Sequence, residues 1–190
     1  MTSRSPTDDS PRSRAKPKSK SRPEPGPAQA PIQEYAGDEA DELPIGGYAA
    51  MLGVFLASFV GLVATARATH VLPKRLPVRD IALLGVATHK LTRIVTRERV
   101  TIPLRVPFAH YEGRDGAGQV KEEPRGEGVR RAIGTMLTCQ YCAGPWIATG
   151  LIAGLLFAPR ATRIACGMLS VVAISDFLHQ AYAGSRRWSR

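Results

Sequence analysis

The chain has few of the residues from which recognisable catalytic sites are built. It contains three cysteines and four histidines in 190 residues. It has no nucleotide-binding glycine-rich loop, nucleophile elbow or His-Glu-x-x-His zincin motif. The odd cysteine count, with Cys166 distant in sequence from the other two, excludes a secreted disulfide framework. RNA-binding and helix-turn-helix signatures are absent as well, so we predict no nucleic-acid partner.

Residues 1–44 have little apolar side-chain area. This segment holds fifteen charged residues, with a basic half from Arg4 to Arg22 and an acidic half from Glu24 to Glu42. Such a segment cannot bury enough apolar surface to offset its chain entropy, so we predict a disordered, charged, Pro-rich tail. We interpret it as a solvated tether, and the alternative is a basic arm that contacts anionic lipid.

The rest of the chain is rich in apolar sequence. Ile45–Ala66 has 22 residues without a charge, and a helix needs about 20 apolar residues to cross a bilayer. Cys142–Ala158 and Ile164–Ala183 are two further apolar runs. Val78–Thr96 is a marginal span because its second half is basic, and the alternative for it is an amphipathic interfacial helix. The sequence therefore predicts an all-α, multi-pass transmembrane helical bundle with four spans.

The connections between these runs are more polar. We expect a long cytoplasmic loop at 97–138, in which the two prolines of Thr101–Phe108 favour extended backbone. The Gly-rich, charged stretch Glu112–Gly128 is typical of a mobile loop. Pro159–Thr162 is expected to be a tight connection between the last two spans. Residues 184–190 form a basic C-terminal tail.

The basic residues predict the orientation. With four spans, the tail, the long loop and the C-terminus share one side, which holds eighteen of the 26 Lys and Arg. The positive-inside rule then places both termini in the cytoplasm and predicts a multi-pass cell-membrane protein. Its expected partners are a bilayer with anionic headgroups and other transmembrane helices, in a homo- or hetero-oligomer. Gly150 and Gly154, a Gly-x-x-x-Gly pair, are the expected helix-packing residues.

The chemically distinctive stretch is Cys139–Trp146, where two cysteines three residues apart precede an apolar helix. If the last two spans form a hairpin that turns near Pro159, equal rise per residue places Asp176 and His179 level with this stretch. The second span ends at the same depth and contributes two basic residues. The predicted cluster therefore consists of Lys90, Arg93, Cys139, Cys142, Trp146, Asp176 and His179.

Three interpretations of this cluster remain open. In the one we favour, Asp176 is the counter-ion of Arg93 or Lys90, and no cofactor is needed. In the second, Cys139, Cys142 and His179 bind a metal such as zinc, with Asp176 as a further ligand. In the third, the cysteines are a redox pair, which a reducing cytoplasm and the lack of a thioredoxin-like βαβ pattern disfavour.

We therefore predict a non-enzymatic structural or interaction protein of the membrane that needs no cofactor, with zinc as the alternative. The alternative is a metal-binding or thiol-dependent membrane sensor or enzyme that uses the Cys-x-x-Cys turn.

Four short stretches, taken in order, resemble a known family. They are Ala87–Thr96, Ile102–Arg105, Pro107–Phe108 and Cys139–Trp146. Their order and spacing resemble the bacterial domain-of-unknown-function family thirteen-sixty over residues 78–183. These are small multi-span membrane proteins, one of them associated with sporulation, so the resemblance implies an integral membrane protein without an assigned activity. The family pattern has an arginine in place of Lys90 and an aliphatic residue in place of Pro145, and it supplies no catalytic residue.

Overall fold

The structure, a computed structural model, describes residues 35, 44–116 and 118–188. It divides the chain into two compact units, Met1–Ala40 and Asp41–Arg190. Everything below concerns the second unit. Apart from Tyr35 and Pro44, the tail predicted at residues 1–44 lies outside the described residues, as do the last two residues of the basic C-terminal tail.

Three long apolar helices correspond to the three clear apolar runs. They are α2 (Ile45–Ala68), α6 (Gln140–Phe157) and α7 (Pro159–Trp188). Each is long and apolar enough to cross a membrane, which confirms the predicted helical, membrane-type architecture. The expected connection at Pro159–Thr162 is the first turn of α7 instead, because proline is well suited to the first helical position, where no N–H donor is needed.

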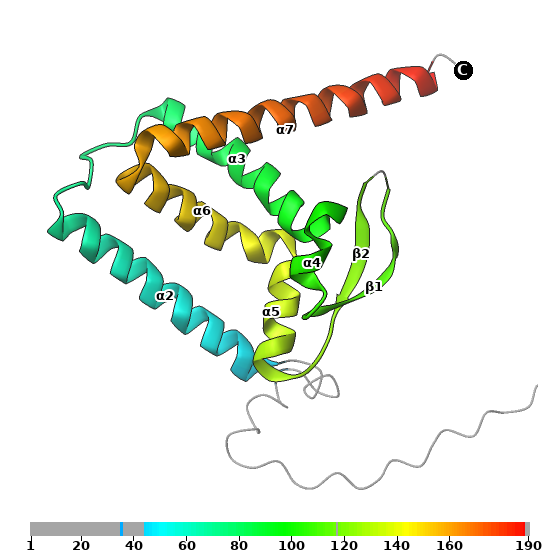
Figure 1. Ribbon diagram of the computed structural model, residues 1–190, viewed down its shortest axis with the longest axis horizontal. Coiled ribbons are helices and arrows are strands. Elements are labelled where there is room, and N and C mark those ends of the chain that lie inside the picture. The colour runs from blue at the N-terminus through cyan, green and yellow to red at the C-terminus, as the bar shows by residue number, and fades with distance from the viewer. Residues whose placement is uncertain (1–34, 36–43, 117, 189–190) are drawn as a thin grey trace, which may run out of the picture. The chain divides into compact units, whose positions relative to one another are not determined.

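Helix α3 (Val78–Arg97) lies between α6 and α7 and packs against both (Figure 1). Its Leu84 and Ala87 form a small core with Leu155 of α6 and Cys166 of α7. Helix α3 is not among the helices of the described residues that qualify as spans by length and composition. Its basic second half accounts for that.

Residues 97–138 are more ordered than the sequence suggested. A 3-10 turn η2 (Arg99–Thr101) leads into the short helix α4 (Ile102–Arg105), so the prediction of extended backbone there was wrong. Pro103 occupies the second position of α4, where the absence of an N–H costs no helical hydrogen bond. Helix α5 (Gly128–Thr138) then leads to the cysteine turn.

The expected mobile loop contains a β-hairpin. Strand β1 (Ala109–Arg114) pairs antiparallel with β2 (Val120–Pro124), with a bulge between Tyr111 and Gly113. Gly116 and Gly118 adopt positive φ angles of 93° and 76° in the turn, a conformation that glycine tolerates without steric cost. A bridge between Glu98 and Gln119 holds the turn beside the end of α3.

Close backbone contacts occur at glycines other than the predicted pair. At Gly134 of α5, a Cβ would collide with the Phe108 carbonyl oxygen, and at Gly47 of α2 it would come within 2.6 Å of the Gly128 carbonyl oxygen. Of the Gly-x-x-x-Gly pair, Gly154 alone is crowded, by the Thr162 hydroxyl at 2.7 Å, while Gly150 has nothing within 4 Å. These glycines thus allow close approach of α2 to the start of α5, of α5 to Phe108, and of α6 to the start of α7.

Candidate functional site

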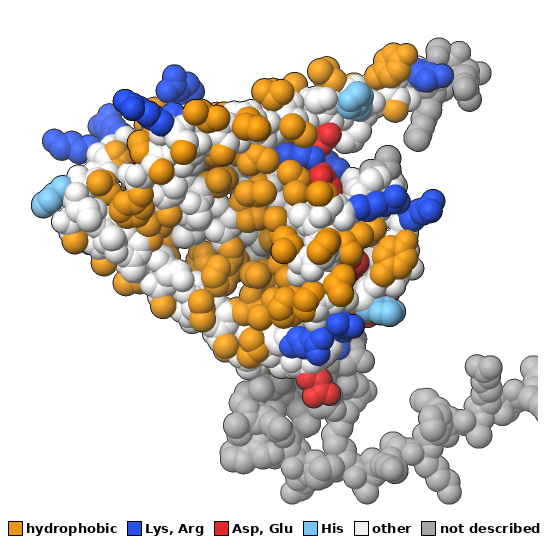
Figure 2. All heavy atoms as spheres, viewed as in Figure 1, with side chains coloured by type: hydrophobic (Ala, Val, Ile, Leu, Met, Phe, Trp, Pro, Cys, Tyr) orange, Lys and Arg blue, Asp and Glu red, His pale blue; other side chains and the backbone are white. Residues whose placement is uncertain are grey.

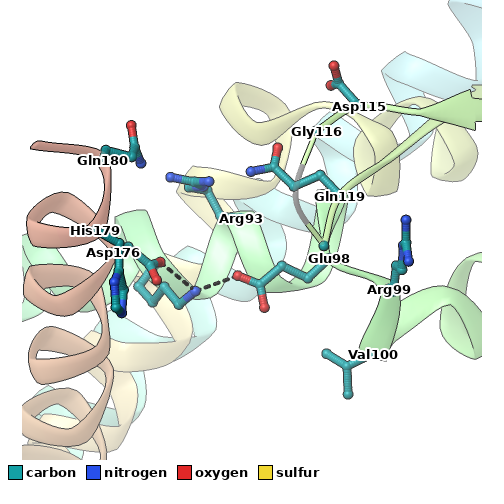
Figure 3. A pocket seen from close by; sticks show the side chains of 12 residues that line it. Arg93, Glu98, Arg99, Val100, Asp115, Gly116, Gln119, Asp176, His179 and Gln180 are labelled. Atoms are coloured by element: carbon teal, nitrogen blue, oxygen red, sulfur yellow. Dashed lines mark hydrogen bonds and ion pairs between the residues drawn. The ribbon is translucent and has the colours of Figure 1, made fainter. Parts of the chain in front are cut away.

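A polar cavity opens where α3 and α7 meet the hairpin. Its volume is about 690 Å³, and it is lined by the C-terminal half of α3, the η2 turn, the hairpin turn and one face of α7 (Figure 3). The lining side chains carry both signs of charge. They include Lys90, Arg93, Glu98, Arg99, Asp115, Gln119, Asp176, His179 and Gln180. Four residues of the predicted cluster therefore meet here: Lys90, Arg93, Asp176 and His179.

Lys90 is the buried centre of this site. It is only 4% exposed, and its Nζ donates to Asp176 Oδ2 of α7 at 2.9 Å. It also donates to Glu98 Oε1, just beyond the end of α3. This is one of the two pairings that the sequence suggested for Asp176. A buried cation needs such partners because its desolvation is otherwise uncompensated, so the triad ties α3 to α7.

The other basic residues near the cavity differ in their partners. Arg97 Nη1 donates to Asp115 Oδ2 at 3.2 Å, across the base of the hairpin turn. Among the residues that the structure describes, the side chains of Arg93 and Arg99 make no hydrogen bond or ion pair. His89 stacks on Phe177, with ring centroids 6.1 Å apart. The cavity therefore contains one lysine shared by two carboxylates, and two guanidinium groups that have no side-chain partner among the described residues.

The cysteine turn lies apart from this cavity. A disulfide joins Cys139 to Cys142, whose Cα atoms are 5.2 Å apart. Cys139 is the N-cap of α6, and its sulphur accepts a hydrogen bond from the Cys142 N–H at 3.2 Å. Trp146 packs edge-on against Phe55 of α2 with ring centroids 5.2 Å apart. The turn therefore faces α2 and α5.

The predicted metal set is not brought together, which corrects the hairpin geometry assumed from the sequence. Cys142 lines a small pocket with residues of α2 and α5, whereas His179 lines the polar cavity. The reason is that α3 packs between α6 and α7, so these helices separate beyond their shared hinge (Figure 1). No group of three or more His, Cys, Asp or Glu in the described part of the chain is arranged to hold a metal ion.

The sequence did not single out two buried charged residues, Asp80 and Arg105. Asp80, which is 1% exposed, accepts two hydrogen bonds from Arg163 of α7, at 3.1 Å from Nε and 2.7 Å from Nη2. Arg105 is fully buried and binds Glu122 of β2. The sequence signal for the Asp80–Arg163 pair was an acidic residue near the start of α3 and a basic residue near the start of α7. The presence of Arg105 in a stretch resembling the family was a weak signal for the second.

Comparison with known proteins matches the part of the chain that contains the polar cavity and the cysteine turn. The family model described as "Protein of unknown function (DUF1360)" matches residues 83–182. The sporulation protein YjcA of Bacillus subtilis is 30% identical over 101 residues, which are 52% of this chain and 86% of the relative. The UPF0713 protein YngL of the same organism is 30% identical over 104 residues, covering 53% and 74% of the two chains. No solved structure matches.

Proposed function

Because this chain belongs to the DUF1360 family of unknown function, as its resemblance indicated, we propose that it is a multi-pass integral membrane protein with a structural or interaction role and no catalytic activity. The outward-facing apolar surface of its long helices carries this proposal. Only 6% of the residues in the apolar window of α2, and 11% in those of α6 and α7, are buried. Such surface is stable in lipid or against other apolar helices.

The distribution of charge supports the same proposal. Hydrophobic side chains spread over the helices, while Lys and Arg side chains gather toward the helix ends on the face that Figure 2 shows. Basic side chains at helix ends reach the headgroup region with little desolvation cost. This pattern fits a bundle embedded in a bilayer with anionic headgroups.

We further propose that α3 is a fourth span in spite of its charges. It runs beside α7 from the Asp80–Arg163 pair to the Lys90–Asp176 pair. Ionisable groups inside a membrane are tolerated when they pair and face the bundle interior, and Asp80 and Lys90 are both buried. Residues of α7 thus pair with the buried charges of α3, which would otherwise disfavour a span.

If the chain crosses the membrane four times, the hairpin and the cysteine turn lie on the same side as both termini. That side carries most of the Lys and Arg of the sequence, so the positive-inside rule favours the cytoplasm for it. The loop between α2 and α3 and the hinge between α6 and α7 then lie outside the cell.

Cysteine labelling in intact cells tests this topology. In a chain whose native cysteines are replaced by serine, Lys74→Cys lies before α3, Glu123→Cys lies after it, and Arg160→Cys lies at the α6–α7 hinge. We expect a membrane-impermeant maleimide to label Lys74→Cys and Arg160→Cys from outside, and Glu123→Cys only after permeabilisation. Labelling of Lys74→Cys and Glu123→Cys from one side would show that α3 does not cross. The opposite pattern at all three sites would reverse the proposed orientation.

A thiol-dependent role is the second candidate, and the Cys139–Cys142 disulfide is the observation that favours it. Cys142 is exposed to solvent, and Cys139 caps the N-terminus of α6. Helix N-termini stabilise thiolates, the reactive form of cysteine. On a cytoplasmic face, a disulfide in such a position is typical of catalytic or redox-sensing cysteines. The chain would then act as a membrane sensor or enzyme.

Acid-trapping of thiols tests the second candidate. We expect the wild type in membranes to change reversibly between oxidised and reduced forms when treated with diamide and then dithiothreitol. Cys139→Ser and Cys142→Ser each abolish that change, and Cys166→Ser serves as the matched control because Cys166 is a buried free cysteine. A pair that stays reduced under diamide, or stays oxidised under dithiothreitol, would contradict a redox role and leave the cysteines structural.

A further inference from the structure

The cavity beside Lys90 has the dimensions and chemistry of a ligand site. Its volume of about 690 Å³ falls inside the range of roughly 300–1,000 Å³ that small-molecule sites occupy. Its walls come from three separate parts of the chain, which are α3 with η2, the hairpin turn, and α7. In Figure 3, Arg93 of α3, Gln119 of the hairpin turn and Gln180 of α7 lie around one space, whereas Arg99 and Asp115 point away from Arg93.

The carboxylates that line the cavity already have partners. Asp176 and Glu98 both accept from Lys90 Nζ, and Asp115 accepts from Arg97. A carboxylate that is already paired with a Lys or Arg is a poor ligand for a further cation. This argues against a cationic ligand.

Among the described residues, the polar side chains that line the cavity without a hydrogen bond or ion pair are two guanidinium groups, two amides and the His179 imidazole. Arg93 and Arg99 make no side-chain hydrogen bond or ion pair among the described residues. In Figure 3 the Arg93 guanidinium projects into the cavity between the side chains of Gln119 and Gln180. Arg93 is partly buried, so its charge is less screened than that of an exposed arginine. A guanidinium presents paired N–H donors in a planar fork, which matches the oxygens of a phosphate group.

We propose that this cavity binds a phosphate-bearing anion, with Arg93 as the principal ligand, Gln119 and Gln180 as neutral donors, and Arg99 as a second cation at the wall. Lys90 stays paired with Glu98 and Asp176 and does not contact the anion. Two sources can supply the group, the headgroup of an anionic phospholipid and free phosphate. The lipid source rests on the proposed membrane insertion, whereas the free phosphate source does not.

Binding to the purified full-length chain in a neutral detergent tests the proposal. The probes are short-chain phosphatidylglycerol and inorganic phosphate, each titrated by calorimetry. We expect Arg93→Gln to weaken binding of the recognised probe about tenfold or more, since charge-assisted hydrogen bonds to a buried ligand are strong. Arg79→Gln is the matched control, because Arg79 is an exposed arginine on the same helix that does not line the cavity.

The outcomes separate the two sources and the two proposals. Arg93-dependent binding of phosphatidylglycerol without competition from inorganic phosphate identifies a lipid headgroup site, and Arg93-dependent binding of inorganic phosphate identifies a free phosphate site. If neither probe binds, or if Arg93→Gln, Arg79→Gln and the wild type bind equally, the proposal is wrong. Should Arg93→Gln fail to fold, Gln119→Ala on the hairpin turn provides the same test. If the labelling shows that α3 does not cross and phosphate binding still depends on Arg93, the four-span topology is rejected and the cavity is retained as an anion site.

Discussion

Replacing Arg105 by leucine is expected to cost about 3–5 kcal/mol of folding stability, the usual penalty for breaking a buried ion pair by removing one partner. Arg105 is fully buried, and its guanidinium donates to Val95 O and to Thr101 Oγ1, both at 2.6 Å. It also donates to Glu98 O at 3.0 Å and to the Glu122 carboxylate. One side chain thus joins the end of α3, the η2 turn and the hairpin.

The loss arises mainly from the groups that Arg105 leaves behind. The side chain of Glu122 is only 6% exposed, and without Arg105 it becomes a buried charge that lacks its salt-bridge partner. A thermal melt in detergent is expected to shift down by on the order of 10 °C for Arg105→Leu. Arg125→Leu is the matched control, because Arg125 is exposed and makes one weak side-chain bond, to Pro107 O at 3.4 Å. Equal melting temperatures for the two variants would contradict the structural role of Arg105.

A double replacement separates the ion pair from the rest of the network. In Arg105→Leu combined with Glu122→Leu, no unpaired charge remains, so part of the lost stability should return. The carbonyl oxygens of Val95 and Glu98 remain without their donor, so recovery should be incomplete.

Replacing Lys90 by methionine is the second change with a large expected effect. Methionine fills much of the same volume but leaves Asp176 and Glu98 without their shared cation at the junction of α3 and α7. We expect a loss of about 1–3 kcal/mol, because Glu98 and Asp176 are 27% and 34% exposed and water partly replaces the lysine. A thermal melt in detergent is the measurement. Adding Asp176→Asn to Lys90→Met should restore part of the stability, because it neutralises one of the two unpaired carboxylates. With Asp176→Asn alone as the remaining member of the cycle, the departure of the double variant from additivity measures the coupling of the pair.

Lys121→Met is the matched control for Lys90. Lys121 is 66% exposed and pairs with Glu112 at 2.7 Å on the hairpin. That hydrogen bond lowers the pKa of the Glu112 carboxyl and raises the pKa of the Lys121 ammonium group, but solvent screens exposed pairs and leaves them little net energy. A melting temperature for Lys90→Met as high as that for Lys121→Met would show that the ion pairs of Lys90 with Glu98 and Asp176 contribute no stability.

Local properties of the chain were enough to predict its long helices. Three apolar runs became α2, α6 and α7 because a stretch of about 20 apolar residues has few stable alternatives to a helix. The helix at Val78–Thr96 was also expected and appears as α3, one residue longer. The family resemblance rested on short motifs in a fixed order, which are likewise a property of the sequence.

The hairpin could not be predicted from local pattern. Strand β1 reads Ala-His-Tyr-Glu-Gly-Arg and lacks the apolar alternation of a half-buried strand. Its stability comes from outside the strand, through the buried Arg105–Glu122 bond and the close approach of α5 at Gly134. Tertiary packing here overrides weak local preference.

By itself, the sequence determined which segments form long apolar helices. It also showed that Lys90 lies in the second predicted helix and that Asp176 and His179 lie in the last. Only the tertiary structure decided which of those residues meet, because a helix shows its composition locally but acquires its neighbours from the fold. Helix α3 packs between α6 and α7, so Lys90 reaches Asp176 while His179 is kept away from the cysteine turn. The same packing compensates the charges of α3. An ion pair between helices forms only where the two residues lie at the same depth, and hydropathy along the chain does not show which residues do so.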